Sequence, residues 1–302
     1  MQKTRLARYE RSMSREGILL YMPAVLIIVG VILYPIVYAF LMSFTSYTIR
    51  HPVMEFIGLK NYINILKDVS FWKAVVRSLL FTVGSLIPQI VIGLAIASLL
   101  NHPRLRCKML FRGLVIIPWL IPTVSVALIF RWMFHDMYGI MNYLMMDLHL
   151  ISQPKAWISE KTFAMCILIL ANIWRGTPML IVMFLAGMQS IPSDIYEAGH
   201  IDGANAWMRF YKLTLPLLMP VVMISGVLRF IWAFNFFDLP WVMTGGGPAE
   251  ATQTTPIYAY RRAFSSYRMG EGSAITIILF IILIMFTIVY FSLKRYQDKL
   301  YK

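Results

Sequence analysis

Six long apolar runs dominate the pattern of hydrophobic and polar positions along this chain. A helix that crosses the hydrocarbon core of a bilayer needs about 20 consecutive, mostly apolar residues. The runs meet that length, and Pro and Gly occur inside them, as is common in membrane helices. They cover residues 18–44, 77–100, 113–131, 162–188, 213–237 and 273–293. The pattern therefore predicts an all-α, polytopic membrane protein with six transmembrane helices.

The polar segments between the runs are short, so the sequence predicts no soluble domain. We expect residues 1–17 to form a basic N-terminal segment, 18–293 the six-span domain and 294–302 a tail. The basic N-terminus followed by an apolar run imitates a signal peptide. However, the uncharged stretch continues from Gly17 to Ile49, far beyond the apolar region of a cleavable signal. We therefore interpret it as a retained first span.

The Lys and Arg residues predict the orientation of the spans, because cytoplasmic segments carry an excess of both. With the N-terminus inside, the inner segments 1–17, 101–112, 189–212 and 294–302 hold 15 basic residues. The outer segments 45–76, 132–161 and 238–272 are longer in total and hold 9. We therefore expect both termini and the segment 189–212 on the cytoplasmic side.

Composition supports the membrane class and excludes other classes. Of the 302 residues, 59% are hydrophobic and 14% charged, whereas a soluble domain is about a quarter charged. The net charge of +14 does not indicate nucleic-acid binding, because the basic residues lie mainly at the ends of apolar runs. Cys107 and Cys166 are too few for a disulfide framework, and no histidine spacing typical of a metal site occurs. We predict no catalytic residue, no metal and no enzyme activity in this chain.

The most specific segment of the sequence, residues 191–220, follows the fourth run and extends into the start of the fifth. Ser193 and Asp194 are expected to cap the start of a helix by accepting hydrogen bonds from its first N–H groups. Asp202 and Gly203 then favour a tight turn, and a second helix is expected to begin around residue 204 or 205. The segment predicts a helix-turn-helix that lies at the membrane surface and docks with a partner protein.

This segment resembles the cytoplasmic coupling motif of ATP-binding-cassette importer permeases. That motif reads Glu-Ala-Ala, three residues, Gly, about nine residues, then an apolar residue, any residue and Leu-Pro. The chain matches it at Glu197, Ala198, Gly203, Leu213, Leu215 and Pro216. Gly199 stands where the family has its second Ala, a small-for-small change. The resemblance implies a coupling site made of Ser193, Tyr196, Glu197, Ala198, Asp202, Gly203, Ala204 and Trp207.

Further residues resemble the carbohydrate branch of the same family. Within the coupling segment they are residues 201–204, Trp207 and Phe210. An outer loop reads Thr-Gly-Gly-Gly-Pro at residues 244–248 and is followed by Tyr258, Tyr260, Ala263 and Phe264. The three glycines are not a phosphate-binding loop, because no Lys-Ser/Thr pair follows them. We expect the backbone of this loop to be a flexible turn.

The resemblance implies a type I importer permease fold and an assembly around it. The chain would be the transmembrane permease subunit of an ATP-driven carbohydrate importer in the cytoplasmic membrane of a bacterium or archaeon. Its implied partners are a second homologous permease, a cytoplasmic ATPase dimer, an extracytoplasmic solute-binding protein, the sugar and membrane lipid. The chain itself would need no cofactor, since ATP and Mg belong to the partner ATPase.

Polar residues inside the spans are candidates for solute contacts, because such residues are costly in a bilayer and usually functional. Amide, carboxylate and guanidinium groups reach sugar hydroxyls, and an aromatic face covers the C–H side of the ring. The predicted cavity residues are Asn172, Arg175, Arg229, Trp232, Asn235, Phe236 and Asp238. Two other interpretations stay open: each Arg pairs with a group of a neighbouring helix, and a Trp near the end of a span anchors it at the interface.

Other functions stay open at this point. A secondary transporter works without an ATPase, but it usually needs more spans, and no carboxylate stands centrally in a span here. A membrane scaffold or a polytopic enzyme is another alternative, as is a permease of the same class for a non-sugar solute. Among sugars, Arg131, Arg175 and Arg229 suit an anionic derivative such as a phosphate or sulfonate ester, while a neutral saccharide fits the resemblance equally.

Overall fold

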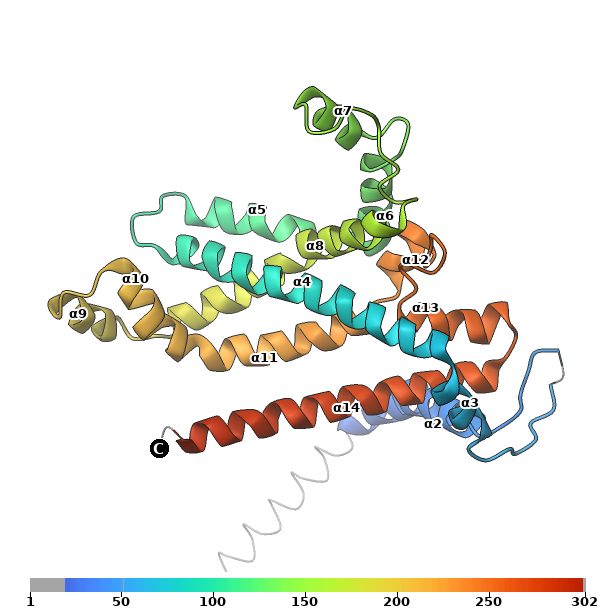
Figure 1. Ribbon diagram of the computed structural model, residues 1–302. Helices are drawn as coiled ribbons and strands as arrows, with labels where there is room; N and C mark the ends of the chain where they lie inside the picture. The colour runs from blue at the N-terminus through green and yellow to red at the C-terminus, as the bar shows by residue number, and fades with distance from the viewer. Residues whose placement is uncertain (1–19, 51, 301–302) are drawn as a thin grey trace, which may run out of the picture. The chain divides into compact units, whose positions relative to one another are not determined.

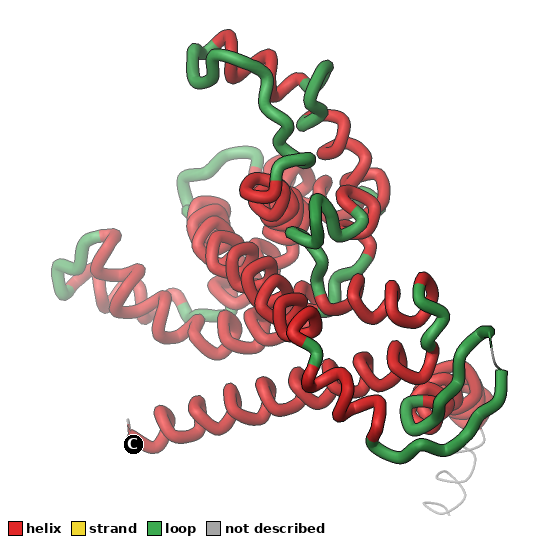
Figure 2. The backbone as a smooth tube through the Cα atoms, turned by 45° about the vertical axis from the view of Figure 1, so that its right-hand side comes forward, coloured by secondary structure: helices red, strands yellow, loops and turns green. Residues whose placement is uncertain are grey.

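The computed structural model describes residues 20–50 and 52–300, with side chains as far as residue 292. The described chain is mostly helical (Figure 1, Figure 2), which confirms the all-α prediction. Five of its helices are long and apolar enough to cross a membrane, and a sharply bent helix pair makes a sixth crossing if it counts as one span. The predicted N-terminal segment 1–17 lies outside the described residues.

The helices form two compact units. The larger unit contains residues 68–258 and 282–300, and the smaller one contains residues 20–67 and 259–281. Three long helices make the centre of the larger unit: α4 (Val69–Asn101), α8 (Lys161–Gln189) and α11 (Leu215–Phe234).

Close packing joins α4 and α8 along much of their length (Figure 1). A Cβ atom on Gly93 of α4 would lie 3.1 Å from the ring of Phe184 in α8, so the glycine lets the two helices approach. Ala97, Leu180 and Leu218 are buried in the same cluster as Phe184. Small residues at such contacts suit a bilayer, because lipid is as apolar as the side chains and close packing has to hold the helices together.

The third apolar run, predicted as one span, is a sharply bent helix pair and not one continuous helix. It divides into α5 (Lys108–Leu120) and α6 (Thr123–Met133), and the two axes differ in direction by 88°. Ile121 between them is extended, with φ −70° and ψ 131°. Pro122 follows it, and proline disfavours the helical conformation of the residue before it. The second half of this run therefore turns away from the first and leads to the short helix α7 (Ile140–Asp147).

The loop after α11, which the sequence places on the outer side and predicts to be a flexible turn, is packed against its neighbours. It follows α12 (Asp238–Thr244). The Thr252 hydroxyl donates to the Gly247 carbonyl oxygen over 2.6 Å and lies 2.7 Å from the Thr244 hydroxyl. The Thr255 backbone N–H donates to the Ser78 hydroxyl of α4 over 2.8 Å. The buried threonines after the glycines therefore hold the loop, and α13 (Thr255–Tyr260) and η3 (Arg261–Ser265) continue the chain.

Three segments lie together at one end of the larger unit, opposite to α12 (Figure 1). They are the α4–α5 connection, the segment between α8 and α11, and the last part of α14 (Met269–Leu300). The part of α14 in this unit packs on α11: the rings of Phe230 and Phe286 are 3.9 Å apart, and Tyr290 Oη donates to the Met223 carbonyl oxygen over 3.2 Å. Segments that the distribution of Lys and Arg predicts to share one side of the membrane thus lie at the same end of this unit, and the side itself stays a prediction.

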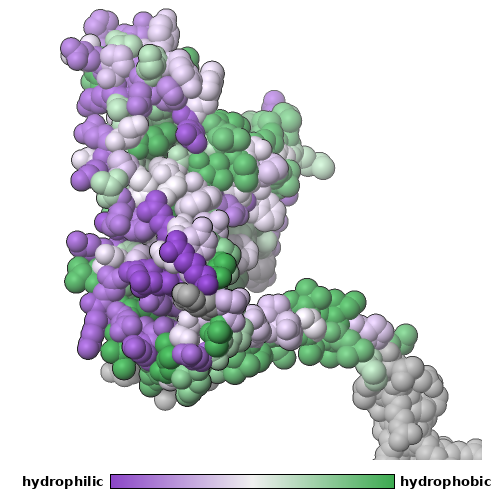
Figure 3. Space-filling model, turned by 90° about the vertical axis from the view of Figure 1, so that its right-hand side faces the viewer, coloured by the Kyte–Doolittle hydropathy of each residue, from purple (hydrophilic) through white to green (hydrophobic). Residues whose placement is uncertain are grey.

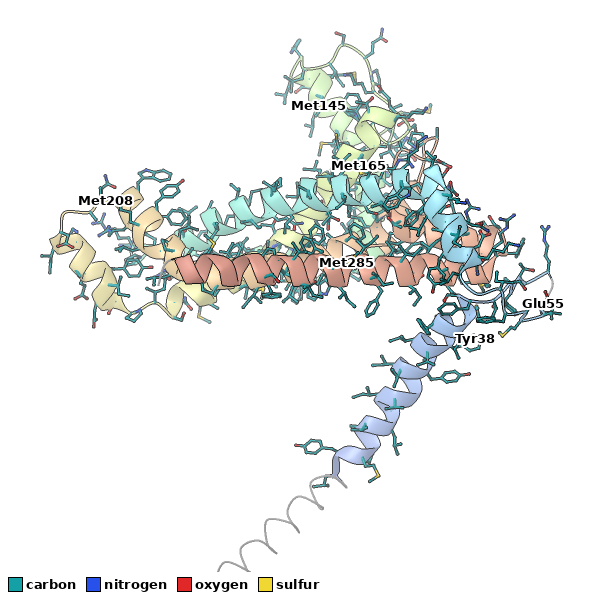
Figure 4. All side chains as sticks on the ribbon, turned by 60° about the horizontal axis from the view of Figure 1, so that its bottom comes forward. Tyr38, Glu55, Met145, Met165, Met208 and Met285 are labelled. Carbon is teal, nitrogen blue, oxygen red and sulfur yellow. The ribbon has the colours of Figure 1, made fainter. Side chains whose placement is uncertain are left out.

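The smaller unit contains the first apolar helix, Leu20–Met42, in which no residue is buried. Its elements η1 (Ile28–Leu33) and α2 (Tyr34–Met42) contain no buried residue. Figure 3 shows the apolar surface of this helix, and Figure 4 shows side chains such as Tyr38 projecting from it. At its end, Asn61 of α3 (Lys60–Lys67) donates to the carbonyl oxygens of Ser43 and Thr45, each over 2.9 Å.

Candidate functional site

The segment between α8 and α11 forms the predicted helix-turn-helix. Its first helix, α9 (Ser193–Ile201), starts at the expected residue, but the expected caps are wrong. Pro192 occupies the N-cap position, and no side chain caps the helix. Ser193 and Asp194 are already inside the first turn, where the Ser193 hydroxyl donates to the Asp194 carboxylate over 3.3 Å. An acidic residue there still favours the helix, because it faces the positive end of the helix dipole.

The turn after α9 depends on Gly203, whose φ is +74°. This left-handed conformation suits glycine, because a Cβ atom would clash with the backbone. The turn is closed by the Ala204 N–H, which donates to the Gly199 carbonyl oxygen over 2.9 Å. Asn205 then caps α10 (Ala206–Arg209), accepting a hydrogen bond from the Met208 N–H over 2.8 Å. The predicted start of the second helix is confirmed.

The inner face of α9 packs on η2 (Phe210–Thr214), which continues into α11. Gly199 is buried, and a Cβ atom there would lie 2.7 Å from Leu213 Cδ1. Gly199 therefore leaves room for the tip of the Leu213 side chain against α9, and an Ala there would need that side chain to shift. The hydroxyls of Tyr196 and Thr214 are 3.2 Å apart and form a hydrogen bond. These contacts join the two helices into one compact element.

The outer face of this element exposes large apolar side chains. Ile201 is 87% exposed and Trp207 72% exposed, and Trp207 stacks on Tyr211 with ring centroids 6.0 Å apart. Met208 of α10, labelled in Figure 4, is exposed as well. We call this the coupling surface, and define it by Glu197, Ala198, Ile201, Asp202, Trp207, Met208 and Tyr211, all of them exposed. Exposed apolar patches on a protein mark interaction sites. The site prediction omitted Ile201, Met208 and Tyr211, although their apolar character beside a polar turn was visible in the sequence.

A second arrangement lies inside the larger unit, where three polar side chains meet. Arg229 of α11 donates through Nε to Gln89 Oε1 of α4 over 2.9 Å, and through Nη2 to Asn172 Oδ1 of α8 over 2.7 Å. Gln89 Nε2 in turn donates to the Asn172 carbonyl oxygen over 2.7 Å. Gln89 and Asn172 are fully buried, and Arg229 is 5% exposed. We call these residues the central polar cluster.

Gly176 makes room for this cluster. A Cβ atom on Gly176 would collide with the guanidinium group of Arg229 and would lie 2.6 Å from Gln89 Nε2. The guanidinium therefore lies directly against the backbone of α8. It forms no ion pair with a carboxylate in the part of the chain that the structure describes, so neutral amide oxygens stabilise the buried charge. Sequence reasoning missed Gln89 and Gly176; a Gln within an apolar run was a usable signal, but no local signal marked the glycine.

The structure divides the predicted cavity residues into two groups. Asn172 and Arg229 belong to the central polar cluster, which favours the interpretation in which an intramembrane Arg pairs with neighbouring helices. Arg175 lies one helical turn from Asn172, and its guanidinium carbon is 5.5 Å from the centre of the Phe236 ring. Trp232, Asn235 and Asp238 are exposed around the end of α11 and the start of α12. The seven residues therefore do not line one enclosed pocket within the described chain.

The geometry thus offers a docking face at one end of the larger unit and a polar joint among its long helices. No group of three or more His, Cys, Asp or Glu residues with metal-binding geometry occurs among the described residues.

Comparison with known proteins identifies the family. Residues 89–302 match the family described as the binding-protein-dependent transport system inner membrane component. The trehalose/maltose transport system permease protein MalF of Thermococcus litoralis is 34% identical over 287 residues, which are 94% of this chain and 95% of that protein. The sulfoquinovosyl glycerol transport system permease protein SmoG of Agrobacterium fabrum is 33% identical over 283 residues, 93% of this chain and 91% of that protein.

A solved structure shares the fold. It is a bacterial ABC transporter involved in the import of the acidic polysaccharide alginate, and one of its chains superimposes with a TM-score of 0.81 at 19% sequence identity. The match covers 95% of this chain and 98% of that chain. The fold agrees with the sequence matches. This chain therefore belongs to the family of binding-protein-dependent transport system inner membrane components.

Proposed function

We propose that this chain is one of two permease subunits of an ATP-driven carbohydrate importer, and that its coupling surface receives the motion of a cytoplasmic ATPase. The single observation that carries the proposal is the coupling surface itself. It exposes Ile201, Trp207 and Tyr211 on a compact element that is continuous with two membrane-spanning helices. A pocket on a partner protein buries such side chains favourably, because large aromatic residues dominate the energetics of protein interfaces.

The contacts of this element suit the transmission of force. The Tyr196–Thr214 hydrogen bond and the approach of Gly199 to Leu213 hold α9 against η2. A push on the coupling surface therefore displaces the ends of α8 and α11 together. Farther from the coupling surface, the central polar cluster ties both helices to α4. We infer that α4, α8 and α11 move as one body when the ATPase closes.

Orientation and partners follow from the same arrangement. The distribution of Lys and Arg supports a cytoplasmic position for the coupling surface and for both termini. ATP and Mg would bind to the separate ATPase dimer, and a second homologous permease would complete the pathway. An extracytoplasmic solute-binding protein would dock on the opposite side. The related alginate transporter was solved in complex with a periplasmic protein that holds an alginate pentasaccharide, which supports this arrangement.

A carbohydrate is the proposed solute, because several relatives carry sugar transport in their names. Besides the two relatives described above, the lactose transport system permease protein LacF of Rhizobium radiobacter is 30% identical over 300 residues, 98% of this chain and all of that protein. We propose Arg175, Trp232, Asn235, Phe236 and Asp238 as solute contacts, since they combine polar groups with aromatic faces at one end of α11. Calorimetry of the cognate solute-binding protein against neutral and anionic sugars tests the solute; tight binding of a non-sugar alone would contradict it.

The coupling role is tested in a reconstituted transporter, with ATP hydrolysis and solute uptake measured separately. Gly203→Val forces a β-branched residue into φ +74° and distorts the turn. We expect uptake to fall at least tenfold while the chain still inserts into the membrane. Gly58→Val is the matched control, because Gly58 has φ +58° and no atom within 4 Å of its Cβ position. Glu197→Lys reverses an exposed charge and is expected to uncouple hydrolysis from uptake. Normal uptake by both coupling variants would contradict the proposal.

A further inference from the structure

An apolar hollow lies between the end of α4 and the beginning of α5. Its volume is about 440 Å³. Its wall is made mostly of aliphatic and aromatic side chains, which are Ile96, Leu99, Leu100, Leu105, Phe111 and Val115. Water gains few hydrogen bonds against such a wall, so hydrocarbon is the favourable filling.

Basic residues surround the turn that closes this hollow. His102 and Arg104 contribute to its lining. Residues 101–112 contain Arg104, Arg106, Lys108 and Arg112 and no acidic residue. None of these four forms an ion pair within the described part of the chain, and the Nε atom of Arg112 is buried without a hydrogen-bond partner there. The turn therefore presents uncompensated positive charge beside an apolar hollow.

We propose that this hollow and the basic turn form a binding site for an anionic phospholipid of the inner leaflet. One acyl chain occupies the hollow, and the phosphate contacts the basic side chains. The position on the inner leaflet rests on the orientation given under the proposed function. Basic clusters at the cytoplasmic ends of membrane helices attract anionic lipid headgroups, and long basic side chains reach the headgroup level from such positions.

Lipid fits this site better than a soluble partner does. The hollow is lined by the end of α4, the beginning of α5 and the turn between them, where lipid headgroups meet acyl chains. A cytoplasmic protein instead meets the coupling surface, whose apolar side chains are exposed to water. Two lining residues also contact the core near the coupling surface: Leu105 and Val115 pack on the buried cluster that contains Leu100, Met188 and Leu218. A bound lipid therefore stabilises the packing of the α4–α5 turn on the end of α8, which directly precedes α9 of the coupling surface.

The test measures lipid retention by the purified full-length transporter complex. Complexes are exchanged into nanodiscs of phosphatidylcholine and phosphatidylglycerol, extracted with detergent and examined by native mass spectrometry. We expect the wild type to retain phosphatidylglycerol in preference to phosphatidylcholine. The triple variant Arg104→Gln, Arg106→Gln, Lys108→Gln should lose tenfold or more of this retention, because each basic residue near a membrane surface contributes about fivefold, or about 1 kcal/mol.

Two further variants make the result specific. Val115→Trp fills the hollow without changing charge and should reduce phosphatidylglycerol retention several-fold. This variant tests the proposal independently if the triple variant does not fold. The control variant Lys60→Gln, Lys67→Gln, Lys73→Gln removes three exposed charges from the predicted outer segment and should retain lipid normally. The proposal is overturned by unchanged lipid retention in Val115→Trp or by an equal loss of retention in the lysine control variant. It is also overturned if a photo-crosslinker at Leu99 labels another protein in place of lipid. Lipid retention together with absent sugar uptake would contradict the proposed function alone.

Discussion

The coupling surface and the central polar cluster place side chains in opposite environments: one exposes apolar groups, and the other buries a charged group. The coupling surface exposes apolar residues to water and is built from one contiguous segment of about two helical turns on either side of Gly203. The central polar cluster buries a charge among apolar helices, and its hydrogen bonds join residues 57, 83 and 140 positions apart. Each arrangement is unfavourable in isolation, so each indicates a role beyond simple packing.

The comparison also separates stability from function. The apolar side chains of the coupling surface contribute little to the fold of this chain, because they have few neighbours within it. Arg229, Gln89 and Asn172 of the central polar cluster are joined by three hydrogen bonds, although Asn172 Nδ2 is buried without a partner among the described residues. Removing one of these side chains leaves further buried polar groups without partners. Substitutions in the coupling surface should therefore weaken an assembly, while substitutions in the central polar cluster should weaken the subunit itself.

The largest effect is expected from Gly176→Val. Its side chain would occupy the space of the Arg229 guanidinium and separate that group from Gln89 and Asn172. Breaking a buried charged arrangement costs about 3–5 kcal/mol, and we expect the free energy of unfolding to fall by this amount in detergent titrations. Gly30→Val is the control, since no atom lies within 4 Å of its Cβ position. Equal stability of the two variants would show that the cluster does not tie the helices together.

A smaller effect, confined to assembly, is expected from Trp207→Ala. Trp207 is 72% exposed, so the stability of the subunit should change by no more than about 0.5 kcal/mol. Its affinity for the ATPase should fall about 30-fold, because a buried interface Trp commonly contributes about 2 kcal/mol or more. Co-purification and titration of the ATPase measure this loss. Trp132→Ala, which removes another exposed Trp at the end of α6, should bind normally; the proposed docking face is wrong if both variants bind alike.

The sequence predicts the coupling surface better than it predicts the central polar cluster. Spacing alone placed the coupling helices, because the turn at Gly203 and the cap at Asn205 are decided by neighbours a few residues away. The expected caps Ser193 and Asp194 lie one and two positions after the actual N-cap residue, Pro192. The break of the third span came from Pro122, and prolines at other positions, such as Pro88 and Pro178, lie inside continuous helices. Tertiary packing decides between these outcomes.

The central polar cluster shows what remains beyond local reasoning. Asn172 and Arg229 were recognisable as costly residues inside spans, but the sequence does not state which helices meet. The cluster forms because α4 and α8 approach each other closely. Gly176 is required only because the Arg229 guanidinium from α11 lies against it. The packed threonines at residues 252–255 were overlooked for the same reason, since one of their partners, Ser78, is 177 residues away from Thr255.

The finest test of the comparison is a double-mutant cycle between Gln89 and Arg229. Gln89→Leu alone and Arg229→Met alone should each leave a buried polar partner unsatisfied, at a cost of about 1–3 kcal/mol. The double variant removes both sides of the hydrogen bond, so its loss of stability should be smaller than the sum of the single losses by about 1 kcal/mol. A parallel cycle between Arg229→Met and Trp207→Ala should be additive, because Trp207 belongs to the exposed surface and shares no contact with the cluster. Additivity in the first cycle, or coupling of similar size in the second, would contradict the separation of a buried joint from an exposed docking face.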